Sequence, residues 1–377
     1  MALTIQDRNV IETATHKAFY ENIFPKLKHI DGKGVAESFL ATDDPTKCNE
    51  ISIPRVLPIK PNYRRLGAIN GSNAGWLNKN NYNGGSIIES AYFNVALDYI
   101  FDETTELPYT LVTSNDLVFK NAVSSVITDC FAGTLNTITW ANQIMKSIED
   151  MSDVSEFYVY DGTKVTASQA FLDANSDLSN GDLSIGAKSI PYDKRQAFIS
   201  TNMNKAIKSQ YSTNASDLAV MINATGFVNP YTQAESKRVD MSTGLCGLYD
   251  GVIMTLWTTS ELEDVYVCLG ATTKGKETAL AALKKVQGMI VYGDATIRGV
   301  AGVAVEVGED PSQYKTLVFK PYAKFGVKAL SGKSNKLIAS GTISSDELTA
   351  LKTLAVADEL VSGGDGVNYS IRRGEGK

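Results

Sequence analysis

The chain has 377 residues, of which 43% are hydrophobic and 21% charged, so it can build a substantial core in one large domain or two lobes. Its formal net charge of −6 excludes the basic excess on which generic nucleic-acid binding depends. The cysteines form no C-x-x-C pair, and His16 and His29 are the only histidines, so a zinc site or a histidine-based catalytic site has little support. We expect four buried free thiols, at positions 48, 130, 246 and 268.

The N-terminal stretch MALTIQDRNVIE carries acidic residues where a secretory leader needs a basic segment and then an apolar one. No apolar run approaches membrane-spanning length. We therefore expect a protein that is made in the cytosol and has no membrane contact. Apolar residues between 7 and 29 recur at helical spacing, with a break near Pro25.

A proline-rich arm and a polar loop follow. Prolines at 45, 54, 58 and 61 deny the stretch from 44 to 61 a regular helix or a place in a sheet centre, so it should be extended. Lys60, Arg64 and Arg65 form a small basic patch, which we interpret as a contact to a partner protein. Residues 70–86, NGSNAGWLNKNNYNGGS, predict a mobile loop tip that contains Trp76 and Tyr82.

Two long elements come next. Residues 91–102 alternate with period two, which predicts a half-buried strand of roughly 40 Å, about twice the usual length and therefore expected to project from its domain. Apolar residues from 119 to 148 recur at helical intervals after a capping signal. A helix of this length would extend roughly 50 Å and could serve as the backbone of a domain.

The rest of the chain predicts a compact α/β lobe, a pair of closing strands and one more helix. The expected strands are 157–160, 218–223, 248–255, 265–269, 290–292, 300–307 and 316–327. The expected helices are 167–174, 194–211, 276–289 and 346–360. No repeat of fixed period is present.

Two local motifs suggest ligand chemistry, and each lacks a required residue. The stretch from Gly270 to Glu277 follows an expected strand and opens an expected helix like a phosphate-binding loop, but Glu277 stands where Ser or Thr must follow Lys276. Asp173, Asn175 and Asp177 alternate like the first calcium ligands of an EF-hand, without the later glycine and glutamate. We predict no catalytic residue, no cofactor and no metal site.

The order of these elements resembles the major capsid protein of tailed bacteriophages, which has the Hong Kong 97 fold. SAYFNVALDYIFDETTELPYTLVTSNDLVFKNAVSSVI looks like that family's returning loop strand and spine helix. DLAVMINATGFVNPY looks like the entry to its axial domain, and TLVFKPYAKFGVKALSGKS like its late peripheral-domain strands. The resemblance covers most of residues 40–345.

The resemblance implies an α+β fold in six segments. These are an N-terminal arm (1–60), an extended β-hairpin loop (61–114), a peripheral domain with the spine helix (115–212), an axial domain (213–304), returning peripheral strands (305–345), and a C-terminal helix and tail (346–377). It also implies a non-enzymatic virion protein, assembled in the host cytoplasm with scaffold and portal proteins. Its hexamers and pentamers would form an icosahedral shell around double-stranded DNA without sequence-specific binding.

Contacts between subunits would involve the extended loop and its flanks, with Arg64, Arg65, Trp76, Lys79 and Tyr82 as candidates. Some family members cross-link through a loop lysine, and Lys79 lies in the matching loop, where solvation is the simpler role. An encapsulin nanocompartment resembles the same fold and remains an alternative. A nucleotide-binding enzyme that uses Gly270 to Lys276 is a third hypothesis.

Overall fold

The computed structural model describes residues 37–42, 48–56, 90–101, 105–108, 132–162, 164–185, 187–211, 245–309, 316–356, 359–364 and 367–373. The expected helix within 7–29, the loop tip at 70–86, the first half of the long helix and the strand at 218–223 lie outside these ranges.

The α/β lobe is built on a six-stranded sheet. Its order is β6-β13-β10-β7-β9-β8. The strands are β6 (Tyr158–Tyr160), β7 (Arg195–Ser200), β8 (Leu245–Tyr249), β9 (Val252–Trp257), β10 (Val286–Tyr292) and β13 (Asn335–Ser340). Strand β7, which precedes residue 212 in the chain, pairs in parallel with β9, which follows it. The boundary expected at that residue therefore does not separate two sheets.

Helices cover both faces of this sheet because its central strands alternate apolar side chains between them. Ala197 and Ile199 pack in the cluster that contains α6 (Ala167–Leu178) and α7 (Thr201–Tyr211). Phe198 packs in the opposite cluster. That cluster contains α5 (Ala132–Asp150), α9 (Thr259–Cys268), α10 (Glu277–Lys285) and α11 (Ser345–Lys352).

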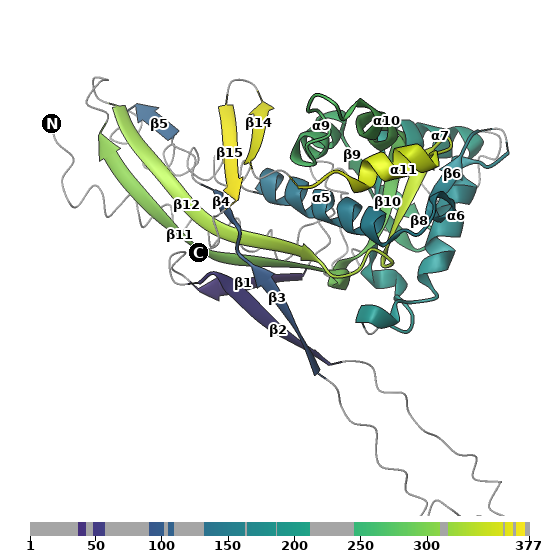
Figure 1. Cartoon of the computed structure of the whole chain (residues 1–377), viewed down its shortest axis with the longest axis horizontal. Coiled ribbons are helices and arrows are strands. Elements are labelled where there is room, and N and C mark those ends of the chain that lie inside the picture. The colour runs from purple at the N-terminus through teal and green to yellow at the C-terminus, as the bar shows by residue number, and fades with distance from the viewer. Residues whose placement is uncertain are drawn as a thin grey trace, which may run out of the picture.

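A second sheet is dominated by a long, curved hairpin (Figure 1). Strands β11 (Thr296–Glu309) and β12 (Thr316–Ala329) each have 14 residues and pair antiparallel. The sheet order is β1-β11-β12-β4-β15-β14, and β5 also pairs with β12. The shorter strands are β1 (Glu37–Thr42), β4 (Tyr99–Phe101), β5 (Thr105–Pro108), β14 (Glu359–Gly364) and β15 (Val367–Arg373).

Helix α5 joins the two sheets. On one side Trp140 makes edge contacts with Phe198 and Trp257 of the lobe, at centroid distances of 5.4 and 5.6 Å. The same core cluster includes Tyr99 and Phe325 of the second sheet, whose rings stack at 5.5 Å. Most of the helix is buried, which is the pattern expected of a helix with neighbours on both sides.

The structure corrects several predicted elements. Residues 194–211 form strand β7 followed by α7, and 276–289 split into α10 and the start of β10. At neither junction, Ser200–Thr201 or Lys285–Val286, does a glycine or proline mark the change of element. Residues 265–269 belong to helix α9 and its end. The signal for this helix was the capping box of Thr258 and Glu261, where the threonine hydroxyl accepts from the Glu261 N–H. The predicted helix at 346–360 is shorter, ending at Lys352.

Candidate functional site: the projecting ribbon and its seat

A two-stranded ribbon extends away from the other described elements (Figure 1). It consists of β2 (Glu50–Val56) and β3 (Ser90–Ala96), which pair antiparallel over seven residues each. Within the described part of the chain these strands form a sheet of their own. We call this pair the ribbon, and we call the part of β11 and β12 beneath its base the seat.

The base of the ribbon is fixed by a small apolar cluster. Ile53 and Val95 of the ribbon are buried together with Ile297 of β11. Ile51, Phe93 and Leu330 pack around these three side chains. The opposite face of the ribbon is polar, where Ser52 donates to the side-chain oxygen of Asn94. One face of the ribbon is therefore apolar toward the seat and the other is polar, as its period-two pattern predicts.

Two glycines allow the ribbon to lie directly on the seat. Gly299 of β11 and Gly326 of β12 are opposite each other in the strand register. A Cβ atom on Gly326 would lie 1.9 Å from the backbone oxygen of Ala96, and one on Gly299 would lie 2.6 Å from Cδ1 of Ile51. Glycine in a strand interior marks such a close approach of another backbone.

Two lysines on the same face as Gly326 hold the ribbon from either side. Lys324 donates from Nζ to the backbone oxygen of Cys48 at 3.2 Å and to the side-chain oxygen of Asn49. Lys328 donates to the backbone oxygen of Asn94 at 2.9 Å. Lys324 therefore binds the residues just before β2 and Lys328 binds β3, and together they fix the position of the ribbon across the seat.

The predicted strand 91–102 is broken where the ribbon joins the second sheet. Strand β3 ends at Ala96 and β4 begins at Tyr99, so a single extended segment serves two sheets. The buried Leu97 closes the base of the ribbon by donating from its backbone N–H to the oxygen of Asn49 at 2.9 Å. The prediction of one continuous strand was wrong at this point, because the chain changes its pairing partner from β2 to β12 and β15.

The predicted contact residues Arg64, Arg65, Trp76, Lys79 and Tyr82 lie outside the described residues. Sequence reasoning missed the glycines and lysines of the seat. A signal was present in Lys324-Phe-Gly-Val-Lys328, where a glycine interrupts a strand between two lysines on the same face.

The segment that resembles a phosphate-binding loop has a structural role. It follows helix α9 and not a strand, so the strand–loop–helix arrangement of that motif is absent from residues 259–285. Lys276 donates from Nζ to the oxygens of Thr353 at 3.3 Å. The Glu277 carboxylate accepts from the backbone N–H of Gly275, which also lowers the pKa of Glu277. An anionic group at this loop would oppose phosphate binding.

The calcium-like triplet also serves packing. It lies in helix α6, where Asn175 donates to Asp250 and accepts from Arg195, and Asp177 binds Lys336 and Tyr158. No group of three or more potential metal ligands occurs among the described residues. Cys268 is a buried free thiol, and burial raises its pKa to about 12. Within the same residues, no helix is long and apolar enough to span a membrane.

No protein-family model matches the chain, and no curated protein matches it in sequence. Among solved structures it is similar to a chain from the head of Helicobacter pylori bacteriophage KHP40, with 9% identity, a TM-score of 0.46 and coverage of 83% of this chain and 88% of that chain. It is also similar to the capsid chain of Ralstonia phage GP4, with 9% identity, a TM-score of 0.45 and coverage of 84% of this chain and 89% of that chain. The mature capsid chain of bacteriophage PhiM1 has 9% identity, a TM-score of 0.44 and coverage of 83% of this chain and 87% of that chain.

Proposed function

We propose that this chain is the major capsid protein of a tailed bacteriophage, and that its copies assemble into hexamers and pentamers of an icosahedral shell around double-stranded DNA. The observation that carries the proposal is the ribbon, which is firmly held at its base and extends away from its own subunit (Figure 1). The sequence also resembles the major capsid protein of tailed bacteriophages.

The ribbon supports assembly because, within the described part of the chain, each of its two strands pairs only with the other and leaves its outer edge open. An isolated two-stranded hairpin is marginally stable in water, and open strand edges are ready to pair or pack with another chain. The apolar cluster of Ile53, Val95 and Ile297 stabilises only the base. A neighbouring copy placed under the outer part would supply the missing contacts, and the glycine seat would aim every ribbon in the same direction.

The remaining parts of the proposal follow from the resemblance. The chain would contact scaffold and portal proteins, act in the virion after assembly in the host cytoplasm, and perform no catalysis. The six segments that the resemblance implies are the proposed domains. Strand β2 of the ribbon belongs to the N-terminal arm and strand β3 to the extended loop. The net charge of −6 suits a container from which densely packed DNA must be released.

Electron microscopy of the full chain, expressed alone and with candidate scaffold proteins, tests the proposal. We expect closed shells or hexameric and pentameric rings. A variant in which a two-residue turn replaces residues 57–89 should remain folded by circular dichroism but form no shells. A wild-type chain that stays monomeric at high concentration under all these conditions would overturn the proposal. Shells that form alone and enclose other proteins would favour the encapsulin alternative.

A further inference from the structure

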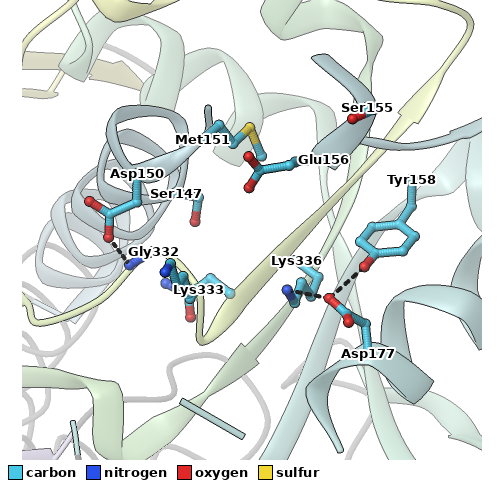
Figure 2. A pocket seen from close by; sticks show the side chains of 11 residues that line it. Ser147, Asp150, Met151, Ser155, Glu156, Tyr158, Asp177, Gly332, Lys333 and Lys336 are labelled. Carbon is cyan, nitrogen blue, oxygen red and sulfur yellow. Dashed lines mark hydrogen bonds and ion pairs between the residues drawn. The ribbon is translucent and has the colours of Figure 1, made fainter. Parts of the chain in front are cut away.

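A pocket of about 200 Å³ lies at the C-terminal end of α5 (Figure 2), and no residue of the ribbon lines it. Its walls come from four separate parts of the chain: the end of α5, the short 3₁₀ helix Val154–Glu156 with β6, helix α6, and the turn that leads from β12 into β13. A pocket of this volume accommodates a molecule with the size of an amino acid.

The turn between β12 and β13 packs closely against the end of α5. The backbone N–H of Gly332 donates to Asp150 at 2.7 Å. A Cβ atom on Gly332 would lie 2.2 Å from the backbone oxygen of Lys146. The pocket therefore has a fixed wall on this side, and the side chain that follows, Lys333, is placed at its rim.

Asn335 is an unsatisfied group in the lining. Its residue exposure is 2%, and both Oδ1 and Nδ2 are without a hydrogen-bond partner among the described residues. A buried amide with neither atom bonded destabilises a folded protein, so such a group points to a missing partner. A ligand that offers both a donor and an acceptor would satisfy it.

Two charged groups complement this amide. Glu156 uses Oε1 to accept from the backbone N–H of Ser152, and its side chain is exposed. Lys333 is exposed, and its side chain forms no hydrogen bond or ion pair with the other described residues. Figure 2 shows the two residues on opposite sides of the pocket. The other charges are already paired, since Lys336 binds Asp177 and Lys146 binds Asp150.

We propose that this pocket binds a small zwitterion of amino-acid size, with the ligand's ammonium group at Glu156, its carboxylate at Lys333 and a polar uncharged group at Asn335. Its occupation would add contacts between α5, helix α6 and the turn at Gly332, all of which line the pocket.

Titration calorimetry of the full chain with L-glutamine tests the proposal. We expect a dissociation constant between about 10 µM and 1 mM, as suits a ligand of this size. N-acetyl-L-glutamine lacks the ammonium group and L-glutaminamide lacks the carboxylate. Each should bind at least about 10-fold more weakly, because the first leaves Glu156 and the second leaves Lys333 without a ligand group of opposite charge.

Three variants assign the contacts. Glu156→Gln and Lys333→Gln change exposed residues and should each weaken L-glutamine binding about 10-fold. Asn335→Leu should abolish binding and raise the melting temperature of the unliganded protein by roughly 1–3 °C, because it removes an unsatisfied amide. Glu263→Gln, an exposed change outside the pocket, should leave binding unchanged.

Three results would each overturn the proposal. The first is no L-glutamine binding at about 10 mM, which would leave a pocket that holds water only. The second is equal binding of L-glutamine and its two analogues. The third is wild-type affinity in Asn335→Leu, or in both charge variants if Asn335→Leu does not fold.

Discussion

Replacement of Gly326 by alanine should displace the ribbon from its seat. The added Cβ atom would lie 1.9 Å from the backbone oxygen of Ala96, whereas real Cβ contacts are not shorter than 3.0 Å, so the backbone of β3 must move by about 1.1 Å. Such a shift breaks the bond from Lys328 to the oxygen of Asn94. Gly299→Ala meets only the side-chain ends of Ile51 and Leu97, which can rotate away.

The two substitutions should therefore differ in free energy. Overpacking costs about 1–3 kcal/mol, and a bond from a charged group that is partly exposed adds about 1 kcal/mol. Complete release of the ribbon would expose Ile53 and Val95, at roughly 3–6 kcal/mol, which sets the upper bound. We expect Gly326→Ala to lower the free energy of unfolding of the ribbon by about 2–4 kcal/mol and Gly299→Ala by about 1 kcal/mol.

Hydrogen exchange of the backbone amides is the assay. In Gly326→Ala the amides of β3 and of Leu97 should exchange about 30-fold to 1000-fold faster, while the amides of α5 remain protected. Shells should be fewer or absent in micrographs. Gly133→Ala is the matched control, because its Cβ meets nothing within 4 Å and alanine favours a helix. Wild-type protection of β3 in Gly326→Ala would refute the reasoning about the seat.

Further predictions concern buried polar groups. Burial alone would raise the pKa of Asp182, but hydrogen bonds from Ser184 and Ser331 outweigh burial and lower that pKa. The ionised Asp182 therefore stabilises the folded protein above about pH 4, and this stabilisation is lost as the pH falls through the pKa of Asp182 in the folded state. Asp182→Asn should lower the free energy of unfolding by about 1–3 kcal/mol in urea at pH 7, with a smaller difference at about pH 3; equal differences at both pH values would contradict this. Burial lowers the pKa of Arg298 to about 9, and its Nη1 donates one long bond, 3.4 Å, to the side-chain oxygen of Asn136. Arg298→Met should be neutral or stabilising by up to about 3 kcal/mol in the same assay, whereas a large loss would show that the charge has an acidic partner. The thiol of Cys268 should react with a thiol reagent at pH 8 only after denaturation, and rapid labelling of the native protein at that residue would argue against its burial.

The sequence predicted long, regular elements better than their ends. The alternation in 300–307 and 316–327 predicted strands that the structure confirms as parts of β11 and β12, and the helical spacing before residue 148 is confirmed for α5. Periodicity identified these elements because each has neighbours on a constant face.

Short apolar runs were ambiguous because a buried helix and a buried strand have similar composition. Residues 265–269 were predicted as a strand, although the capping pair at Thr258 and Glu261 indicated a helix. The split of 91–102 into β3 and β4 also could not be predicted, since alternation continues through Leu97 while the pairing partner changes.

The candidate site depends on contacts between distant parts of the chain. The approach of Gly299 and Gly326 to the ribbon brings together residues more than 200 positions apart, and no local pattern encodes it. The projection of residues 90–96 was predicted from a continuous strand at 91–102 that the structure divides in two, and the place where the ribbon attaches could not be predicted from the sequence. The pocket beside α5 was not predicted, because its lining residues come from four separated segments.

The passage from β3 into β4 has a mechanical consequence. A pull on the ribbon travels along the backbone through Leu97 and reaches β4 in the direction of that strand. Hydrogen bonds of an antiparallel pair run across the strands, so the bonds that join β4 to β12 and β15 bear this load in shear and must rupture together. In the proposed shell, tension between neighbouring subunits would then spread into the second sheet instead of separating one strand from its neighbours bond by bond.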